Sequence, residues 1–166
     1  MVAICAGVLD WRYRRIPNWL TLSGLVAGVG VNTILGGWPG MKASLLGALL
    51  GLGLLLPFVL LRSLGAGDWK LAGALGAILG SSQLLLVLAG SVLVAGVMAI
   101  VLVIYKRRFV ATLRNMGTIL VRLLTGHPGD PSVSLDNPDS LKVPYGVALA
   151  VTVLLYGAAR VWGVAA

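Results

Sequence analysis

Long runs of apolar residues alternate along the chain with short polar and basic stretches. Six such runs cover residues 1–9, 19–35, 44–61, 68–80, 84–105 and 144–162. A helix needs about 20 apolar residues to cross a bilayer. Nine helical residues rise only about 14 Å, so the first run is too short to span. The pattern predicts an all-α fold: a polytopic transmembrane bundle of about six segments, the first one short, forming a single membrane-embedded domain over residues 1–166.

Composition and charge agree with a membrane protein. Hydrophobic residues make up 58% of the chain and charged residues 11%, whereas a soluble domain is about 25% charged. The net charge of +8 would indicate nucleic acid in a soluble protein, but here it follows the rule that Lys and Arg remain in cytoplasmic loops. We therefore predict membrane lipids, and no nucleic acid, as partners. The N-terminus has no basic region before its apolar run, so no signal peptide is predicted.

The distribution of basic residues gives an orientation. If residues 10–18, 62–70 and 106–143 face the cytoplasm, that side carries eleven of the 13 Lys and Arg residues. They are Arg12, Arg14, Arg15, Arg62, Lys70, Lys106, Arg107, Arg108, Arg114, Arg122 and Lys142. The opposite side keeps only Lys42 and Arg160. This asymmetry predicts a multi-pass protein with both termini outside.

The third of these loops contains an element of its own. Over residues 107–125, basic side chains fall on one arc of a helix and apolar side chains on the other. Such a helix lies well in the interface of an anionic leaflet, so we predict an amphipathic helix on the cytoplasmic face. Residues 126–143 are rich in Pro, Gly, Ser and Asp, which indicates a loop.

Small residues mark close packing between the predicted spans. Three pairs of glycines recur at four-residue spacing: Gly24 and Gly28, Gly47 and Gly51, Gly76 and Gly80. This spacing lets helix backbones approach closely, and packing within one bundle is a sufficient explanation. A tight turn is predicted at residues 81–83, after the short fourth segment.

Two of the five acidic residues stand apart from the others. Asp130, Asp136 and Asp139 belong to the loop that ends at residue 143, whereas Asp10 and Asp68 lie at the cytoplasmic ends of apolar segments. Each of these two could pair with a neighbouring cation, Asp10 with Arg12 or Arg14 and Asp68 with Lys70 or Arg62. Ionisable residues at membrane depth more often mark a site.

Taken together, Asp10 and Asp68 suit acid–base hydrolysis. Both lie at one membrane depth on one side, and two close carboxylates share a proton, so one can activate water while the other donates to a peptide carbonyl. Gly65 and Gly67 precede Asp68 and would allow unusual backbone angles and the approach of an extended peptide. The chain has no Glu, one His and one Cys, which excludes HExxH zinc and glutamate-dependent mechanisms; neither a metal nor a cofactor is predicted.

Three stretches resemble motifs of one family. GAGD at 65–68, followed by Lys70 and Leu71, resembles the GxGD motif of the prepilin peptidases, the type IV leader peptidase family of aspartic proteases. DWRYRRIPNWLT at 10–21 resembles its other catalytic segment, an Asp followed by a basic loop and Ile-Pro-Asn. KVPYGVALA at 142–150 resembles its C-terminal Pro-x-Gly span. The resemblance implies Asp10 and Asp68 as the catalytic pair. It implies that the site is shaped by Gly65, Gly67, Lys70, Ile16, Pro17, Asn18, Pro144, Tyr145 and Gly146.

The resemblance also implies a substrate and a location. Members remove the short basic leader of prepilins and pseudopilins at the cytoplasmic face of the bacterial cytoplasmic membrane. Larger members carry a domain with paired CxxC motifs that accompanies N-methylation, whereas this chain resembles the short form of tight-adherence (Flp-type) pili, so methyl transfer is not implied. Its first segment is about ten residues shorter than the family's pattern, which would anchor Asp10 poorly. The amphipathic helix either tethers the loop or docks the substrate or a pilus-assembly protein.

Two alternatives remain at this stage. One is a GxGD protease with another membrane-protein substrate. The other is a small transporter or an assembly scaffold in which Asp10 and Asp68 bind protons or cations. Asp-to-Asn replacement separates them, because a catalytic pair fails when either carboxyl is lost and a scaffold tolerates both changes.

Overall fold

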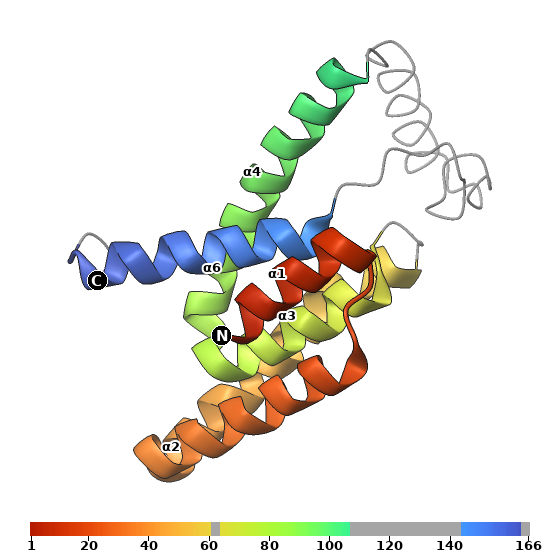
Figure 1. Cartoon of the computed structure of the whole chain (residues 1–166). Helices are drawn as coiled ribbons and strands as arrows, with labels where there is room; N and C mark the ends of the chain where they lie inside the picture. Colours follow the sequence, from red (N-terminus) through yellow and green to blue (C-terminus); the bar gives the residue numbers. More distant parts are fainter. Residues whose placement is uncertain (61–63, 107–143, 164–166) are drawn as a thin grey trace, which may run out of the picture.

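Helices make up almost all of the described part of the chain. The computed structural model describes residues 1–60, 64–106 and 144–163, and the predicted amphipathic helix at 107–125 lies outside them. Five helices follow in order, as Figure 1 shows: α1 (Val2–Tyr13), α2 (Asn18–Leu60), α3 (Ala66–Leu79), α4 (Ser81–Tyr105) and α6 (Tyr145–Val161). The described residues contain no strand, so the predicted all-α class is confirmed for them.

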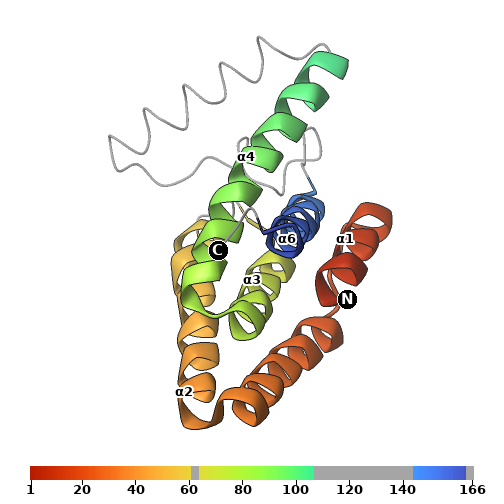
Figure 2. The ribbon, with the colours of Figure 1, turned by 90° about the vertical axis from the view of Figure 1, so that its left-hand side faces the viewer.

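Helix α2 is a hairpin of two arms. Its 43 residues are interrupted at Gly37, whose φ of 58° and ψ of −144° are not helical. Figure 2 shows the chain running down one arm and returning along the other. Pro39 follows the break, where the first turn of a new helix tolerates its missing N–H. The two arms correspond to the apolar runs predicted at 19–35 and 44–61, while the intervening residues are helical except at the break.

Helix α3 packs against both arms of α2 through glycines. A Cβ atom built on Gly28 would lie 2.8 Å from the carbonyl carbon of Ala77, and one built on Gly51 would lie 2.6 Å from the carbonyl oxygen of Ala72. Gly47 and Gly76 face each other with backbone against backbone. The close approach predicted from glycine spacing is therefore present, because no larger residue would fit at these positions.

Gly80 lies against Gly47, as Gly76 does, and also has a second role. It has a φ of 80° and ψ of 173°, and no atom lies within 4 Å of the Cβ position. Its backbone turns the chain between α3 and α4, so α4 starts at Ser81. The turn predicted at residues 81–83 is wrong in position, because one glycine in a conformation that L-residues avoid supplies the whole reversal.

The remaining helices pack on this unit. Helix α1 lies against α6, where a Cβ on Gly7 would meet the Ala150 side chain at 2.6 Å. Helix α6 in turn lies against α4, where Gly90 faces Thr152. Helix α1 continues to Tyr13, beyond the apolar run predicted at 1–9, so Asp10 lies inside a helix.

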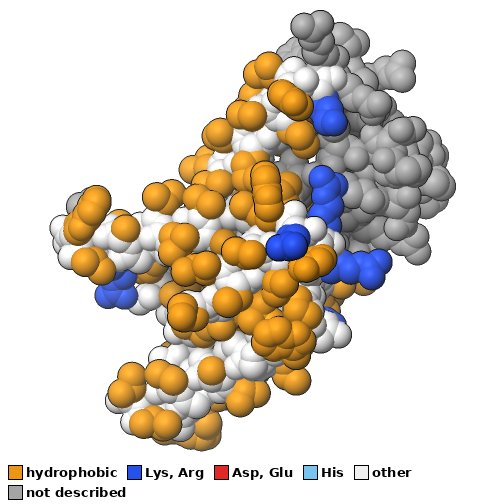
Figure 3. Space-filling view, in the orientation of Figure 1, with side chains coloured by type: hydrophobic (Ala, Val, Ile, Leu, Met, Phe, Trp, Pro, Cys, Tyr) orange, Lys and Arg blue, Asp and Glu red, His pale blue; other side chains and the backbone are white. Residues whose placement is uncertain are grey.

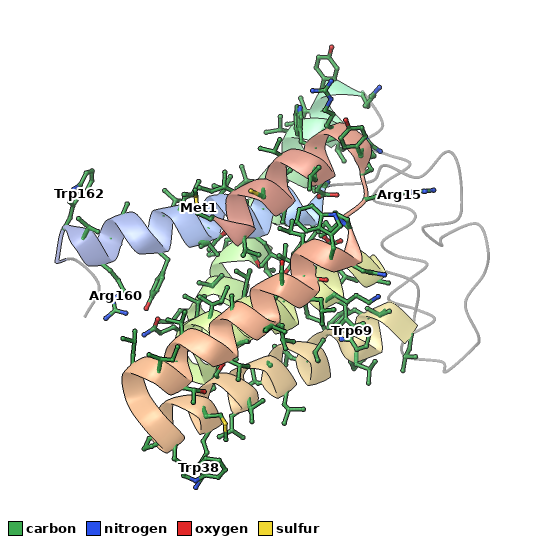
Figure 4. The ribbon with its side chains drawn as sticks, turned by 60° about the horizontal axis from the view of Figure 1, so that its bottom comes forward. Met1, Arg15, Trp38, Trp69, Arg160 and Trp162 are labelled. Carbon is green, nitrogen blue, oxygen red and sulfur yellow. The ribbon has the colours of Figure 1, made fainter. Side chains whose placement is uncertain are left out.

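The surface is that of a membrane protein. Helices α2 and α4 are long and apolar enough to cross a bilayer, and α6 is a shorter apolar helix. Figure 3 shows hydrophobic side chains over most of one face, while Lys and Arg gather mainly along one edge beside the grey residues. In Figure 4, Arg15 lies at that end, away from Arg160 and Trp162. These features indicate a membrane location; the count of six spans remains a prediction.

Candidate active site

Asp10 is buried in the last turn of α1. Its side chain is 7% exposed, and α1 ends three residues later at Tyr13. The C-cap residue, Arg14, adopts a left-handed conformation with a φ of 50°. Gly146, in the first turn of α6, lies directly against the carboxyl. A Cβ atom on Gly146 would be 2.8 Å from Asp10 Oδ2 and 3.0 Å from its Cβ. Only glycine leaves room for the carboxyl between these two helices.

Asp68 lies in the first turn of α3, and its side chain folds back toward the start of that helix. A Cβ on Gly65, the N-cap residue, would be 3.1 Å from Asp68 Oδ2. A Cβ on Gly67 would be 3.2 Å from the Cβ of Ile16, which is buried in the connection between α1 and α2. Neither Gly65 nor Gly67 has a positive φ. Both glycines therefore provide space, and the unusual backbone angles predicted for them are not present.

The structure brings the two carboxyls into one environment. The Asp10 charge acts electrostatically on Asp68, and the backbone of Gly146 interacts with both side chains. Asp10 Oδ2 and Asp68 Oδ1 are buried without a hydrogen-bond partner in the described part of the chain. A buried oxygen without a partner costs about 1–3 kcal/mol, and such groups in a native fold call for an explanation. Availability for a reaction is such an explanation.

The surroundings shift the two carboxyls unequally. Both lie at helix ends, outside α2 and α4. Burial and, secondly, the Asp10 charge raise the pKa of Asp68 from 3.8 to about 7. Burial also raises the pKa of Asp10, but the backbone N–H groups of Gly146 and Val147 and the charge of Arg14 act in the opposite direction. Asp68 therefore retains its proton more readily, and Asp10 ionises more readily.

The predicted ion pairs do not account for this arrangement. Lys70 Nζ donates to Asn18 Oδ1 at 2.9 Å, joining the start of α3 to the start of α2. The Arg12 guanidinium lies 5.8 Å from the centre of the Tyr13 ring. Arg14 acts on Asp10 only as one of three influences that lower its pKa. Arg62 lies outside the described residues.

The segments around the carboxyls are tied down by hydrogen bonds. Trp69 Nε1 donates to the Leu52 carbonyl oxygen at 2.7 Å, which fixes the start of α3 on the second arm of α2; Figure 4 labels this residue. Pro17 precedes α2, and its carbonyl oxygen accepts from the Leu20 N–H at 3.1 Å. Pro144 is the N-cap residue of α6, and its carbonyl oxygen accepts from Val147 N–H at 3.2 Å.

The residues singled out from the sequence thus divide into two groups. Gly65, Gly67, Ile16, Tyr145 and Gly146 lie at or directly behind the two carboxyls. Lys70, Asn18, Pro17 and Pro144 fix the neighbouring helix starts.

One residue at this end was missed by sequence reasoning. Ser91, on α4, is fully buried, and its Oγ lies 2.8 Å from the Tyr145 hydroxyl oxygen. Its only signal is a hydroxyl in the middle of an apolar helix, which the motifs do not include. Among residues 1–60, 64–106 and 144–163, no group of three His, Cys, Asp or Glu residues is placed to hold a metal ion.

Comparison with known families identifies the class of protein. Residues 1–100 match the model of the type IV leader peptidase family. The chain belongs to the type IV leader peptidase family. The match includes both Asp10 and Asp68, and it indicates a protease. No curated protein and no solved structure matches the chain.

Proposed function

We propose that this type IV leader peptidase family member is a membrane-embedded aspartic endopeptidase that removes the leader of Flp-type prepilins and pseudopilins. The observation that carries the proposal is the pair of carboxyls from α1 and α3, buried in one environment and each with an oxygen that has no partner. Two carboxyls with separated proton affinities are sufficient for amide hydrolysis and require no cofactor.

The difference between the two carboxyls assigns their roles. Asp10, as the anion, accepts a proton from a water molecule whose oxygen attacks the scissile carbonyl carbon. Asp68 gives its proton to the carbonyl oxygen, so a neutral tetrahedral diol forms. In its collapse, Asp68 takes a proton back from one hydroxyl, and Asp10 gives its proton to the leaving nitrogen. The carboxyls return to their starting states.

The position of the pair supports cleavage at the cytoplasmic face of the cytoplasmic membrane. Asp10 is followed by Arg12, Arg14 and Arg15, and Asp68 by Lys70. In Figure 4, Arg15 lies beside the grey trace, away from Arg160. Such residues remain on the cytoplasmic side of a bacterial membrane. The leader of a prepilin is on that side too, whereas the apolar segment that follows it enters the bilayer. The chain would therefore cut next to the point where its substrate enters the membrane.

The test is processing of a co-expressed Flp-type prepilin with a C-terminal tag. The chain is compared with Asp10→Asn, Asp68→Asn and the control Asp136→Asn, which removes a carboxyl from the loop predicted to be solvated. We expect conversion to the shorter pilin by the parent and by Asp136→Asn, and none by the other two variants. Processing by both Asn variants, at equal protein levels in the membrane, would refute the catalytic pair. Cleavage of a different membrane substrate only would refute the Flp assignment.

A further inference from the structure

The hydroxyl of Ser91 is the one buried polar group on α4 that faces the start of α6. Ser91 is 0% exposed. Its Oγ donates to the Leu88 carbonyl oxygen at 2.8 Å and also lies 2.8 Å from the Tyr145 hydroxyl oxygen. Residues 81–104 contain no charged side chain, so this hydroxyl is the polar contribution of α4 to that end of the bundle.

The direction of these hydrogen bonds follows from counting protons. A serine hydroxyl has one hydrogen, and that of Ser91 is given to Leu88. The hydrogen between Ser91 and Tyr145 must therefore come from the phenol. Once the phenol has donated its only hydrogen, its oxygen can offer only lone pairs to any other neighbour.

Tyr145 belongs to the helix start that contacts the carboxyl pair. It is the first residue of α6 and directly precedes Gly146, whose backbone lies against Asp10. The Asp68 carboxyl acts electrostatically on the Tyr145 hydroxyl. A phenol that can only accept is compatible with a protonated carboxyl or a water molecule. It cannot donate to a carboxylate.

From this geometry we propose that Ser91 is a positioning residue of the site, acting through Tyr145. By accepting the phenol hydrogen, Ser91 keeps the Tyr145 oxygen as an acceptor toward the carboxyls and so favours the pair that retains one proton. This is the state that hydrolysis by two carboxyls requires, and to that extent the inference rests on the proposed function.

The hydroxyl is not needed to hold α4 and α6 together. Gly90 approaches Thr152 so closely that a Cβ there would lie 2.7 Å from Thr152 Cγ2. That contact is one residue away from Ser91 and independent of its hydrogen bond. Removing the Ser91 hydroxyl should therefore leave the helix packing in place and change only the direction in which Tyr145 donates.

The experiment measures cleavage of the tagged Flp-type prepilin by purified protein in liposomes, across about pH 5 to 9. The variants are Ser91→Ala, Tyr145→Phe and the double variant. Ser82→Ala, at an exposed position on α4, and Tyr156→Phe, on α6, are matched controls. The titrating group that acts on the Tyr145 hydroxyl is Asp68 from α3. Asp68 is in turn influenced by Asp10 from α1, on which the Arg14 cation acts.

In Ser91→Ala the phenol is free to donate to a carboxylate, which favours the ionised form. We expect the alkaline limb of its pH profile to move down by about one pH unit. Tyr145→Phe should move the limb less. The double variant should match Tyr145→Phe, because once the phenol is gone the Ser91 hydroxyl has nothing to act on, and its removal changes nothing further. An unchanged limb in Ser91→Ala would overturn the inference. So would a double variant that differs from Tyr145→Phe, because Ser91 would then act by another route.

A second readout does not depend on cleavage. Infrared spectra of the same proteins follow the band of protonated carboxyls against pH, with Asp10→Asn and Asp68→Asn assigning it. Ser91→Ala should lose this band at a lower pH than the parent. If the parent cleaves no prepilin, the proposed function fails, while the infrared titration still decides the role of Ser91. A titration equal to that of the parent would refute it.

Discussion

The two ends of α3 treat buried polar groups in opposite ways. At its C-terminus, the Ala77 carbonyl oxygen accepts from Asn32 Nδ2 at 2.9 Å and from Ser44 Oγ, one residue from each arm of α2. The Ile78 carbonyl oxygen also accepts from Asn32. At its N-terminus, Asp68 Oδ1 and the neighbouring Asp10 Oδ2 are buried with no partner in the described residues.

Within its 14 residues, α3 therefore has one end that is built for stability and one end that bears the candidate catalytic carboxyl. Carbonyls in the last turn of a helix lack helical partners, and the α2 arms supply them as a stable fold requires. The carboxyls at the other end keep a stability cost of about 1–3 kcal/mol each. The fold provides hydrogen-bond partners for buried polar groups at one end of α3. The lack of partners for the carboxyls at the other end therefore indicates a function.

The largest expected effect comes from removing a carboxyl at the unsatisfied end. Asp68→Asn should lower cleavage by about 1,000-fold or more, because acid–base catalysis by one side chain typically contributes 10²- to 10⁴-fold. The same change should raise the melting temperature at pH 8, since it removes a buried negative charge. It should have little effect at pH 4, where the parent carboxyl is already neutral. A fall in melting temperature at pH 8 would show that this carboxyl stabilises the fold.

At the satisfied end, the largest effect should be a loss of stability. Gly47→Ala places a methyl group against the Gly76 backbone, so α2 and α3 must separate. We expect a loss of about 3 kcal/mol or more, because overpacking typically costs 1–3 kcal/mol even where side chains can yield. The measurement is the amount of folded protein in the membrane and its melting temperature. Gly53→Ala on the same arm is the control, since no atom lies within 4 Å of its Cβ position; equal effects of the two changes would contradict the packing.

A change at the boundary between α1 and α6 should act mainly on the reaction. Gly146→Ala would push a methyl group against the Asp10 carboxyl, and a displacement of the order of 1 Å can cost about 100-fold in rate. We therefore expect cleavage to fall by about 10- to 100-fold while the protein still accumulates. Gly157→Ala, on the same helix and without neighbours within 4 Å, should keep parental kinetics. Parental cleavage by Gly146→Ala would place Asp10 outside the reaction.

The pH dependence should reflect the raised pKa of Asp68. Its carboxyl keeps a proton up to about pH 7, so the cleavage rate should fall above that pH by roughly tenfold per unit. Stability has the same sign: the folded state binds more protons than the unfolded state between pH 3.8 and about 7, so stability falls as pH rises through that window. Rates and melting temperatures of the parent across this range test both statements. A rate that is flat from pH 6 to 9 would contradict a shared proton.

The smallest effect is expected from one hydroxyl at the satisfied end. Ser44→Ala removes one of two donors to Ala77, and Asn32 remains, so we expect a loss of about 1 kcal/mol in stability. The pH profile of cleavage should not move. Ser23→Ala, an exposed position on the same helix, is the comparison for the melting temperature. A shifted pH profile in Ser44→Ala would show that the two ends of α3 are coupled.

Sequence patterns anticipated the helices well, but one feature of their packing only in part. The spacing of Gly47 and Gly51 predicted close backbone contact, and both meet α3 as expected. The spacing of Gly76 and Gly80 was identical, and the backbones of both lie against Gly47, yet Gly80 also turns the chain. Spacing alone cannot separate these uses, because the same absent side chain permits both close approach and a positive φ.

The candidate site shows the same limit. Asp10 and Asp68 stand out because acidic residues are rare in this chain, and their motifs carry them. Ser91 carries no such signal, since a single serine in an apolar helix is common and its relation to Tyr145 exists only after α4 and α6 pack. Gly37 was equally hidden among neighbouring glycines, although its backbone divides α2 into two arms.

The hydrogen bonds that Asn32 and Ser44 donate to the C-terminal carbonyls of α3 also affect how deeply this helix can enter a bilayer. Its 14 residues rise about 21 Å, which is less than the roughly 30 Å of a hydrocarbon core. A helix that stops within the hydrocarbon would expose bare carbonyls to acyl chains, which membranes tolerate only where protein surrounds them. Asn32 and Ser44 supply hydrogen-bond donors there, so α3 can end partway across the bilayer. The two arms of α2 thus supply the hydrogen bonds that water would otherwise provide to these carbonyls.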